Sequence, residues 1–488
     1  MLYNLPFFNY VAEQTNEGVG GKLFLLASLV VLMLALNFMM TYLVMFLMRF
    51  VGRILLAILS IINATAVYFI LTYSVMIDAT TIENVFNTRY SEASGFFSWS
   101  LWGFIFVFGV LPALYCLLQP VVIGKAKKLG VWCASSLAII LVVAFANFNQ
   151  TLFFAQHDTE LGGLLQPWSY LVNTGRVISF SHDEQQVEIK LPDGKITDGE
   201  KAVVVLVIGE SARKANFQLY GYQRDTNPLL SKRTDLKVYE ATSCATYTTA
   251  GTKAILEPVN SDDLTELLPN YAFRTGVDVS WRTSNWGEPP IHIDEYLTNE
   301  AIGEQFPGEN ICYDAILMKG IRQRIESSPK NKVLIVLHTS TSHGPKYVDK
   351  YPKTFEVYQP VARNVEEGEK NNGMLVNAYD NTIRYTDYLL DSLITTLQGM
   401  TDWKSAMIFI SDHGESLGEN GMFMHGLPMK LAPKEQYEIP FLVWTSQDFR
   451  AYRSDLPVVL EQHYIFHSVL NLLSIQSPAY NKDFDIFR

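Results

Sequence analysis

The chain has 488 residues, of which 49% are hydrophobic and 18% charged, enough for two or three domains of ordinary size. Its net charge of −11 argues against a nucleic-acid partner, since the one basic cluster is short, at residues 125–128. Aromatic residues make up 13% of the chain, which excludes disorder over most of its length. Four cysteines are too few for a disulfide scaffold.

The first third of the chain is predicted to be an α-helical transmembrane domain, residues 1–155. Its apolar stretches reach the roughly 20 residues that a bilayer requires. The predicted spans are residues 23–48, 54–75, 97–118 and 131–154. A cleavable signal peptide does not fit, because the apolar stretches are too many and too long and no basic segment precedes them.

The charges of the short connections predict the orientation. The first connection carries two arginines and the third carries three lysines, whereas the second, residues 78–94, is mainly acidic. Basic connections face the cytoplasm. The N-terminus and everything after residue 154 are therefore expected outside the cytoplasm, in the periplasm of a Gram-negative cell.

Residues 156–198 are predicted to be a polar connection. Its aromatic residues Trp168 and Tyr170 fit two interpretations: an anchor at the membrane–water interface, or a plain linker.

Residues 199–488 are predicted to form an α/β domain. Short apolar runs typical of strands buried on both faces alternate with helical patterns, the clearest at residues 376–397. The predicted strands are residues 202–208, 277–281, 333–338, 406–411 and 439–444. Such alternation predicts a mostly parallel central sheet with helices on both faces.

Polar residues follow three of these strands. Glu210 comes after the first, Asp412 and His413 follow the run at 406–411, and His343 follows the run at 333–338. Ligands in such folds bind outside the carboxyl ends of strands. Two carboxylates and an imidazole suit zinc with one open position. Glu210 alone also fits a helix-capping role.

Residues 242–250 carry five serine and threonine hydroxyls in nine positions. They fit a loop with local caps. They also fit a hydroxyl nucleophile, whose alkoxide a metal would stabilise.

Five motifs then resemble the phosphoethanolamine transferases, membrane enzymes of the alkaline-phosphatase/sulfatase superfamily that include the mobile colistin-resistance (polymyxin-resistance) enzymes. The motifs are residues 208–213 (IGESAR), 220–228 (YGYQRDTNP), 342–345 (SHGP), 377–381 (NAYDN) and 411–421 (SDHGESLGENG) with its continuation to residue 433. They occur in the family order and cover nearly the whole chain.

The resemblance implies a role for each candidate residue. Thr248 matches the nucleophile, and it also matches a zinc ligand together with Glu210, Asp412 and His413. The substrate-binding candidates implied are His343, His425, Thr246, Asn285 and Glu415. The implied donor is phosphatidylethanolamine and the acceptor a lipopolysaccharide such as lipid A, with Thr248 carrying a covalent phosphoethanolamine between them.

The chain departs from the family pattern in two places. Family members usually have five spans, so either this chain begins late, with residues 1–10 as a remnant of the first, or it has four. The cysteine that usually pairs with the one near the nucleophile is replaced by Ala254. Cys244 is left either to pair with Cys312 or to remain a free thiol.

Three other functions compete. A sulfatase needs Pro and Arg two and four places after its nucleophile, and Thr246 and Thr248 follow Cys244 instead. A phosphoglycerol transferase acting on an envelope glycan is the nearest enzyme alternative. A non-catalytic scaffold would have lost some of the four ligands, and all are present.

Overall fold

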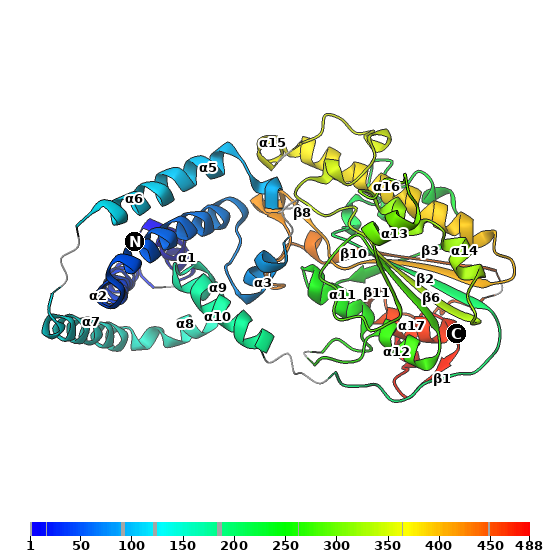
Figure 1. The fold of residues 1–488 in the computed structure, drawn as a ribbon, viewed down its shortest axis with the longest axis horizontal. Helices are drawn as coiled ribbons and strands as arrows, with labels where there is room; N and C mark the ends of the chain where they lie inside the picture. The colour runs from blue at the N-terminus through cyan, green and yellow to red at the C-terminus, as the bar shows by residue number, and fades with distance from the viewer. Residues whose placement is uncertain are drawn as a thin grey trace. The chain divides into compact units, whose positions relative to one another are not determined.

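The computed structural model describes residues 2–15, 17–88, 93–120, 124–182, 188–261, 263–363, 365–447 and 449–488. The chain divides into two compact units. Met1–Thr88 with Phe97–Asp183 form the N-terminal unit, and Arg89–Phe96 with Glu184–Arg488 form the C-terminal unit. Figure 1 shows helices in the first and a sheet covered by helices in the second.

The described part of the N-terminal unit is helical. Helices satisfy their own backbone hydrogen bonds, which apolar surroundings require. The helices are α1 (Leu5–Gln14), α2 (Val19–Tyr73), α3 (Ala79–Asn87), α5 (Trp99–Ile105), α6 (Leu111–Leu118), α7 (Ala126–Ala146), α8 (Thr151–Gln156), α9 (Asp158–Leu164) and α10 (Trp168–His182). A π-helical turn, Phe106–Val110, joins α5 to α6.

Helix α2 contains a reversal of direction. As one straight helix its 55 residues would extend about 80 Å, but Arg49 has φ 43° and ψ −104°. A Cβ built at Gly52 would lie 3.1 Å from the carbonyl oxygen of Val44. Eight residues of straight helix span about 12 Å. The chain therefore turns back at Arg49. One helical arm contains the expected segment 23–48, and the other contains the expected segment 54–75 up to Tyr73, where the helix ends.

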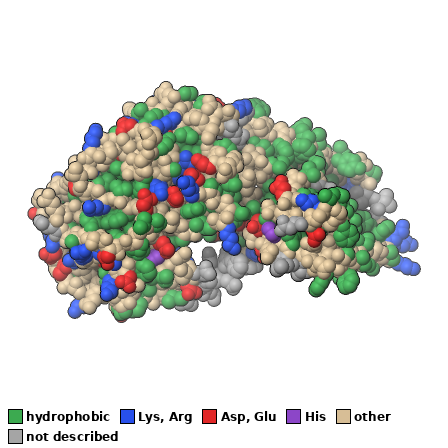
Figure 2. Space-filling model, turned by 180° about the vertical axis from the view of Figure 1, so that it is seen from behind, with side chains coloured by type: hydrophobic (Ala, Val, Ile, Leu, Met, Phe, Trp, Pro, Cys, Tyr) green, Lys and Arg blue, Asp and Glu red, His purple; other side chains and the backbone are tan. Residues whose placement is uncertain are grey.

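Within the residues that the structure describes, three helices are long and apolar enough to cross a membrane: α2, the stretch Trp99–Leu118 and α7. Figure 2 shows hydrophobic side chains gathered over the N-terminal unit, at the right of that view. Helix α7 ends at Ala146 and starts at Ala126, so it differs at both ends from the expected segment 131–154. Lysine is a good helix former, and the basic cluster continues into the first turn of α7.

The interpretation of residues 156–198 as a plain linker is wrong over its first part. Helices α9 and α10 occupy much of it, and the N-terminal unit extends to Asp183. Tyr170 is buried, and its hydroxyl donates to Asn63 Oδ1 at 3.1 Å. This aromatic residue therefore packs inside the unit. Residues 183–187 lie outside the described residues.

An eight-stranded sheet forms the centre of the C-terminal unit. Its order is β11-β3-β10-β7-β2-β6-β4-β5, and within this sheet, as far as the structure describes it, only the two pairings of β10 are antiparallel. These strands are β2 (Ala202–Gly209), β3 (Leu236–Thr242), β4 (Asp278–Thr283), β5 (Glu295–Thr298), β6 (Lys332–His338), β7 (Lys404–Ser411), β10 (Glu438–Thr445) and β11 (Val459–Glu461). Two short pairs lie outside it: β1 (Lys195–Ile196) with β12 (Ile475–Gln476), and β8 (Ser416–Leu417) with β9 (Phe423–Met424).

Helices cover both faces of this sheet, which confirms the predicted fold class (Figure 1). Along β2 the side chains alternate between two cores: Val204 and Leu206 point into one, Val203 and Val205 into the other. Each such burial contributes about 1.5–3 kcal/mol. The helices of this unit are α11 (Thr248–Leu256), α12 (Leu268–Thr275), α13 (Asn299–Gln305), α14 (Ile321–Glu326), α15 (Val365–Lys370), α16 (Asn372–Gln398) and α17 (Tyr464–Leu472).

The register of the central strands positions the polar residues that follow them. Strand β2 pairs in parallel with β6, where Ile208 lies opposite His338, and with β7, where Gly209 lies opposite Ser411. Because these three strands run the same way and end together, the residues after them emerge at one edge of the sheet.

Candidate active site

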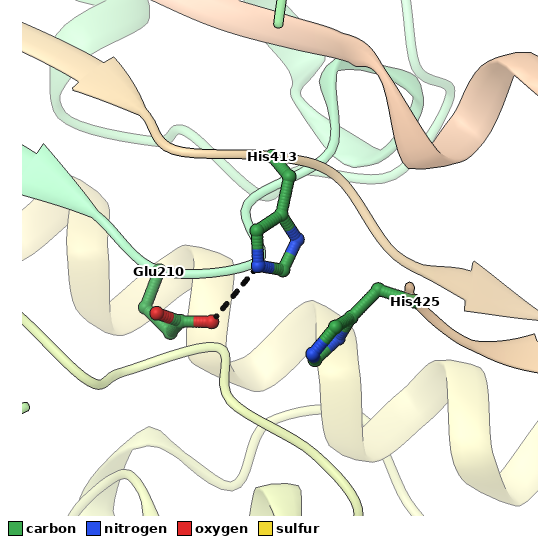
Figure 3. Close-up of side chains that lie close together, drawn as sticks. All are labelled: Glu210, His413 and His425. Carbon is green, nitrogen blue, oxygen red and sulfur yellow. Dashed lines mark ion pairs between the residues drawn. The ribbon is translucent and has the colours of Figure 1, made fainter. Parts of the chain in front are cut away.

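Four of the predicted residues meet at this edge. Glu210 directly follows β2, Asp412 and His413 directly follow β7, and Thr248 is the first residue of α11. All four side chains are buried. Figure 3 shows Glu210 and His413 pointing toward each other, with His425 beside them. The strand ends thus bring together residues that are far apart in the sequence.

Four pairs of polar atoms within this set of residues lie at nearly equal distances. Thr248 Oγ1 is 3.3 Å from Glu210 Oε2 and 3.3 Å from His413 Nε2. His413 Nε2 is 3.4 Å from both Glu210 Oε1 and Asp412 Oδ2. Four tetrahedral ligands at about 2.0–2.1 Å from a zinc ion are separated by about 3.3–3.4 Å. The spacing of these donors therefore fits one tetrahedral metal.

The hydrogen bonds around the cluster leave donor atoms facing it. Asp412 Oδ1 accepts from the backbone N–H of Ser211 at 3.0 Å, whereas its Oδ2 is buried without a hydrogen-bond partner among the described residues. His413 Nδ1 lies 2.8 Å from the carbonyl oxygen of Gly414. A carbonyl only accepts, so Nδ1 carries a proton, and in the neutral form of His413 Nε2 offers its lone pair to the cluster.

The charges of the cluster call for a cation. Burial and the nearby Glu210 carboxylate raise the pKa of Asp412 well above its ordinary value. Burial also acts to raise the pKa of Glu210, but the hydrogen bond with His413 and the positive charges of nearby histidines hold it well below its ordinary value. When both are ionised, the buried carboxylates of Glu210 and Asp412 repel each other. A divalent ion would remove that repulsion, and oxygen and nitrogen donors suit zinc.

Two further predicted histidines lie beside the cluster. His425 forms with Glu210 and His413 a group whose ligand atoms lie within 4.8 Å of one another. Its ring centroid is 4.3 Å from that of His413 and 5.8 Å from that of His343. His343 Nδ1 contacts the carbonyl oxygen of Gly344 at 2.6 Å.

Glu415 contacts the imidazole of His425 through its carboxylate. One carboxylate oxygen lies 2.7 Å from His425 Nδ1, and the other accepts from the Tyr347 hydroxyl at 2.9 Å. Glu415 is fully buried. These contacts allow Glu415 to orient the imidazole of His425, and its predicted role in binding substrate stays a prediction.

The other two weaker candidates are also engaged by protein groups. The Thr246 hydroxyl donates to the carbonyl oxygen of Leu427 at 2.6 Å, which holds the segment that carries His425. Asn285 Nδ2 donates to Glu210 Oε2 at 2.6 Å. Both contacts help to position neighbouring groups, and the predicted substrate contacts of Thr246 and Asn285 stay predictions.

Three further residues shape the site, and the residue patterns did not identify their roles. Ser211 has φ 52°, a left-handed value that is uncommon without glycine, and its hydroxyl donates to Glu210 Oε1 at 2.7 Å. Gln462 Nε2 donates to the carbonyl oxygen of Asp412 at 2.7 Å. At Gly251 a Cβ would collide with that same carbonyl oxygen. Of the three, only Ser211 belongs to a motif found in the sequence, residues 208–213 (IGESAR). The roles of Gln462 and Gly251 depend on tertiary packing.

The cysteines are not paired. All four are free thiols, and Cys312 is exposed while Cys244 is partly buried. Cys244 Sγ lies 3.9 Å from the carbonyl oxygen of Ala250. Of the two alternatives open from the sequence, the structure has the free thiols.

Comparisons with known proteins cover both units. A family model described as Sulfatase matches residues 202–475, and one described as Phosphoethanolamine transferase EptA/EptB matches residues 24–181. The phosphoethanolamine transferase EptA of Helicobacter pylori is 36% identical over 100% of this chain and 94% of its own length. The phosphatidylethanolamine transferase Mcr-1 of Escherichia coli is 29% identical over 97% of this chain and 92% of its own.

Solved structures agree with these sequence matches. The integral membrane lipooligosaccharide phosphoethanolamine transferase A of Neisseria meningitidis superposes with a TM-score of 0.87, at 26% identity, covering 100% of this chain and 96% of that one. The structure of its soluble domain alone covers 62% of this chain and 97% of that one, at 29% identity and a TM-score of 0.55. The likeness therefore extends over the helical unit as well as the sheet.

Proposed function

This chain belongs to the phosphoethanolamine transferase family, and from that premise we propose that it moves phosphoethanolamine from phosphatidylethanolamine to lipid A or another lipopolysaccharide group, with Thr248 as the carrier. The observation that carries the proposal is the position of the Thr248 hydroxyl, 3.3–3.4 Å from the donors of Glu210 and His413. A threonine among buried ligand atoms is suited to activation as an alkoxide.

The proposed metal is zinc, held by Glu210, Asp412, His413 and the Thr248 oxygen. The fit of their spacing and the partnerless Asp412 Oδ2 support this set. When bound, zinc lowers the pKa of a ligated hydroxyl and offsets negative charge on phosphoryl oxygens.

The first proposed step forms an ester on Thr248. Its Oγ1 attacks the phosphorus of phosphatidylethanolamine, and the bond from phosphorus to the diacylglycerol oxygen breaks. The Thr248 proton leaves to a neighbouring base, and the diacylglycerol oxygen gains a proton as it departs. Thr248 begins α11, and the positive end of that helix stabilises the negative charge that gathers there.

The second step reverses the first with a new partner. An oxygen of the lipopolysaccharide acceptor attacks the same phosphorus, the bond to Thr248 Oγ1 breaks, and Thr248 regains a proton. His425 is suited to the proton transfers at leaving and attacking oxygens, because Glu415 fixes its ring from Nδ1. His343, whose ring lies near that of His425, is assigned to the donor phosphate.

The location of the reaction follows from the two units. The chain has N-terminal helices able to span a membrane and a C-terminal unit similar to the soluble domain of the Neisseria transferase. We assign four spans in the bacterial inner membrane and place the C-terminal unit in the periplasm, as the charges of the connections predict. Donor and acceptor are both lipids, so anchoring the catalytic unit to the membrane raises their local concentration.

Peptide mapping tests the carrier. The purified full chain is incubated with phosphatidylethanolamine, and added phosphoethanolamine is expected on Thr248 by mass spectrometry. Thr249→Ala is the matched control, because Thr249 is adjacent and on the same helical turn, and it should still label. An adduct on Ser243, Thr246 or Thr249 would show that the wrong hydroxyl has been assigned.

The acceptor needs a separate measurement. Lipopolysaccharide from cells with and without the protein is compared by mass spectrometry, and phosphoethanolamine is expected on lipid A only when the protein is present. Phosphoglycerol found on an envelope glycan would instead support the alternative transferase.

A further inference from the structure

Two cavities adjoin in the N-terminal unit, far from the residues of the candidate active site in sequence. One has a volume of about 420 Å³ and the other about 430 Å³, each within the range of ligand sites. Gly162, Leu165 and Trp168 line both cavities. A Cβ at Gly162 would meet no atom of the described residues within 4 Å, so a larger side chain there has room to extend into the space that the two cavities border.

The first cavity is apolar. A stripe of α2 lines one side of it, Leu29, Leu32, Met33 and Leu36 at the helical spacing of three and four. Phe7 of α1 and Val143 near the end of α7 line the remainder. Such walls accept a hydrocarbon chain and offer almost nothing to a polar ligand.

The second cavity has polar as well as apolar walls and carries both signs of charge. Asp78, Asp158 and Arg176 line it. Asp78 Oδ1 caps α3 by accepting from the backbone N–H of Thr81 at 2.8 Å. A phosphate suits the guanidinium, which has five donors, and an ammonium suits the carboxylates.

Two buried polar atoms in the wall of the second cavity have no hydrogen-bond partner among the described residues. They are Ser169 Oγ and Trp168 Nε1. Ser169 is only 2% exposed, so the missing bond leaves a buried hydroxyl unpaired at a cost of free energy. Ser169 lines the second cavity and Trp168 lines both, so a ligand with acceptor oxygens in the second cavity would lie near these two unpaired groups.

We propose that the two cavities together bind one phosphatidylethanolamine molecule, with an acyl chain in the apolar cavity and the phosphate and ammonium in the polar one. An anionic lipid such as phosphatidylglycerol offers the phosphate but no cation for Asp78 and Asp158. All the residues that line the two cavities belong to the N-terminal unit, whereas Thr248 belongs to the C-terminal unit.

Photolabelling tests the site. Full-length Thr248→Ala protein, which cannot consume the lipid, is reconstituted in phosphatidylcholine vesicles. These contain either phosphatidylethanolamine or phosphatidylglycerol with a diazirine in one acyl chain. Peptides of α2, α7 and α9 that line the apolar cavity are expected to label at least about fivefold more with phosphatidylethanolamine than with phosphatidylglycerol. The difference corresponds to roughly one charge-assisted contact, which phosphatidylglycerol cannot make because it has no ammonium group. Equal labelling by the two lipids would overturn the proposal.

Variants locate the label. Gly162→Leu places a large side chain where the two cavities adjoin, and it should reduce the labelling at least about fivefold. Gly103→Leu on α5 is the control, because a Cβ there also meets no described atom within 4 Å, and it should leave the labelling unchanged. Arg176→Gln should reduce it about tenfold and Arg176→Lys should restore part of it. Asp78→Asn keeps the helix cap but removes the charge, and it should abolish the preference over phosphatidylglycerol. Labelling that Gly162→Leu leaves unchanged would contradict the site, whatever the transfer activity.

Discussion

The two units bury different kinds of groups. The C-terminal unit buries carboxylates and histidines at the end of its sheet, including Glu210, Asp412 and His413, while its apolar residues fill two cores. The N-terminal unit exposes large apolar residues, such as Phe145 at 84%, and buries few polar ones. In each unit the proposed ligand lies near a buried polar atom to which the described residues offer no hydrogen bond, Asp412 Oδ2 in one and Ser169 Oγ in the other.

This difference indicates which unit carries out the chemistry and which unit contacts lipid. Burying a polar group costs free energy unless the group forms a hydrogen bond. A cluster of buried polar groups whose only atoms without hydrogen bonds face one point therefore indicates a ligand at that point. Exposed apolar groups instead suit contact with lipid tails. Chemistry is therefore expected to respond to changes in the C-terminal unit, and lipid contact to changes in the N-terminal unit.

The strongest test of that division is Thr248→Ala. Removing the proposed carrier should lower phosphoethanolamine transfer at least about 10³-fold, because no other hydroxyl would take over the covalent step. Membrane insertion and the folding of both units should be unchanged. Transfer to lipid A by the purified protein is the measurement, and Thr249→Ala should retain most activity. A fully active Thr248→Ala protein would remove the covalent mechanism.

A buried histidine predicts how the stability of the C-terminal unit depends on pH. Burial lowers the pKa of His467 to about 4, and its Nε2 contacts the carbonyl oxygen of Pro258 at 2.8 Å. The unfolded chain, with a pKa of about 6.5, binds the proton first as the pH falls. Stability should therefore drop between about pH 6.5 and 4, by roughly 3 kcal/mol in all. Thermal unfolding at pH 7 and 5 measures this.

The variant His467→Gln is the control for this pH dependence. It can still donate to the Pro258 carbonyl, but it has no proton to gain in this range. Its unfolding temperature should fall less between pH 7 and 5 than that of the wild type. Equal falls in both proteins would show that His467 does not carry the effect.

Close packing at the site predicts a smaller effect. In Gly251→Ala the new methyl group would collide with the carbonyl oxygen of Asp412, so α11 must move away and take Thr248 with it. A shift of this kind should cost about 10- to 100-fold in transfer and reduce zinc retention. Gly199→Ala is the matched control, because its Cβ would meet no described atom within 4 Å. Equal activity of the two variants would contradict the packing argument.

The smallest effect is expected at the other threonine of the loop. Thr246→Ala removes the hydrogen bond to Leu427, worth about 1 kcal/mol, and loosens the segment that carries His425. Transfer should fall only a few-fold, and zinc content should not change. Loss of activity comparable with that of Thr248→Ala would mean that Thr246 acts directly on the substrate.

Particular residues show how far sequence reasoning reached. The strands could be predicted because a strand buried on both faces needs a continuous apolar run, and Glu210, Asp412 and His413 could be placed because residues after parallel strands emerge at one edge. Residue patterns alone could not choose Thr248 from five neighbouring hydroxyls; that choice came from the family resemblance.

The remaining features depend on tertiary contacts. Thr248 starts a helix that faces the cluster, whereas Thr246, two residues earlier, turns to Leu427. The contacts of Gly251 and Gln462 join segments distant in the sequence, and no local pattern encodes them. Similarly, two arginines near residue 50 predicted a connection, but not that the reversal would be as tight as the one at Arg49.

X-ray absorption at the zinc edge tests the central claim most directly. On the purified full chain the account predicts one zinc per molecule, with four oxygen and nitrogen ligands at about 2.0–2.2 Å and no sulfur. Asp412→Ala should lose most of the metal, since it removes a ligand and leaves the site open. A sulfur ligand at about 2.3 Å, which would indicate binding by a free thiol such as Cys244, or no retained zinc in the wild type, would contradict the account.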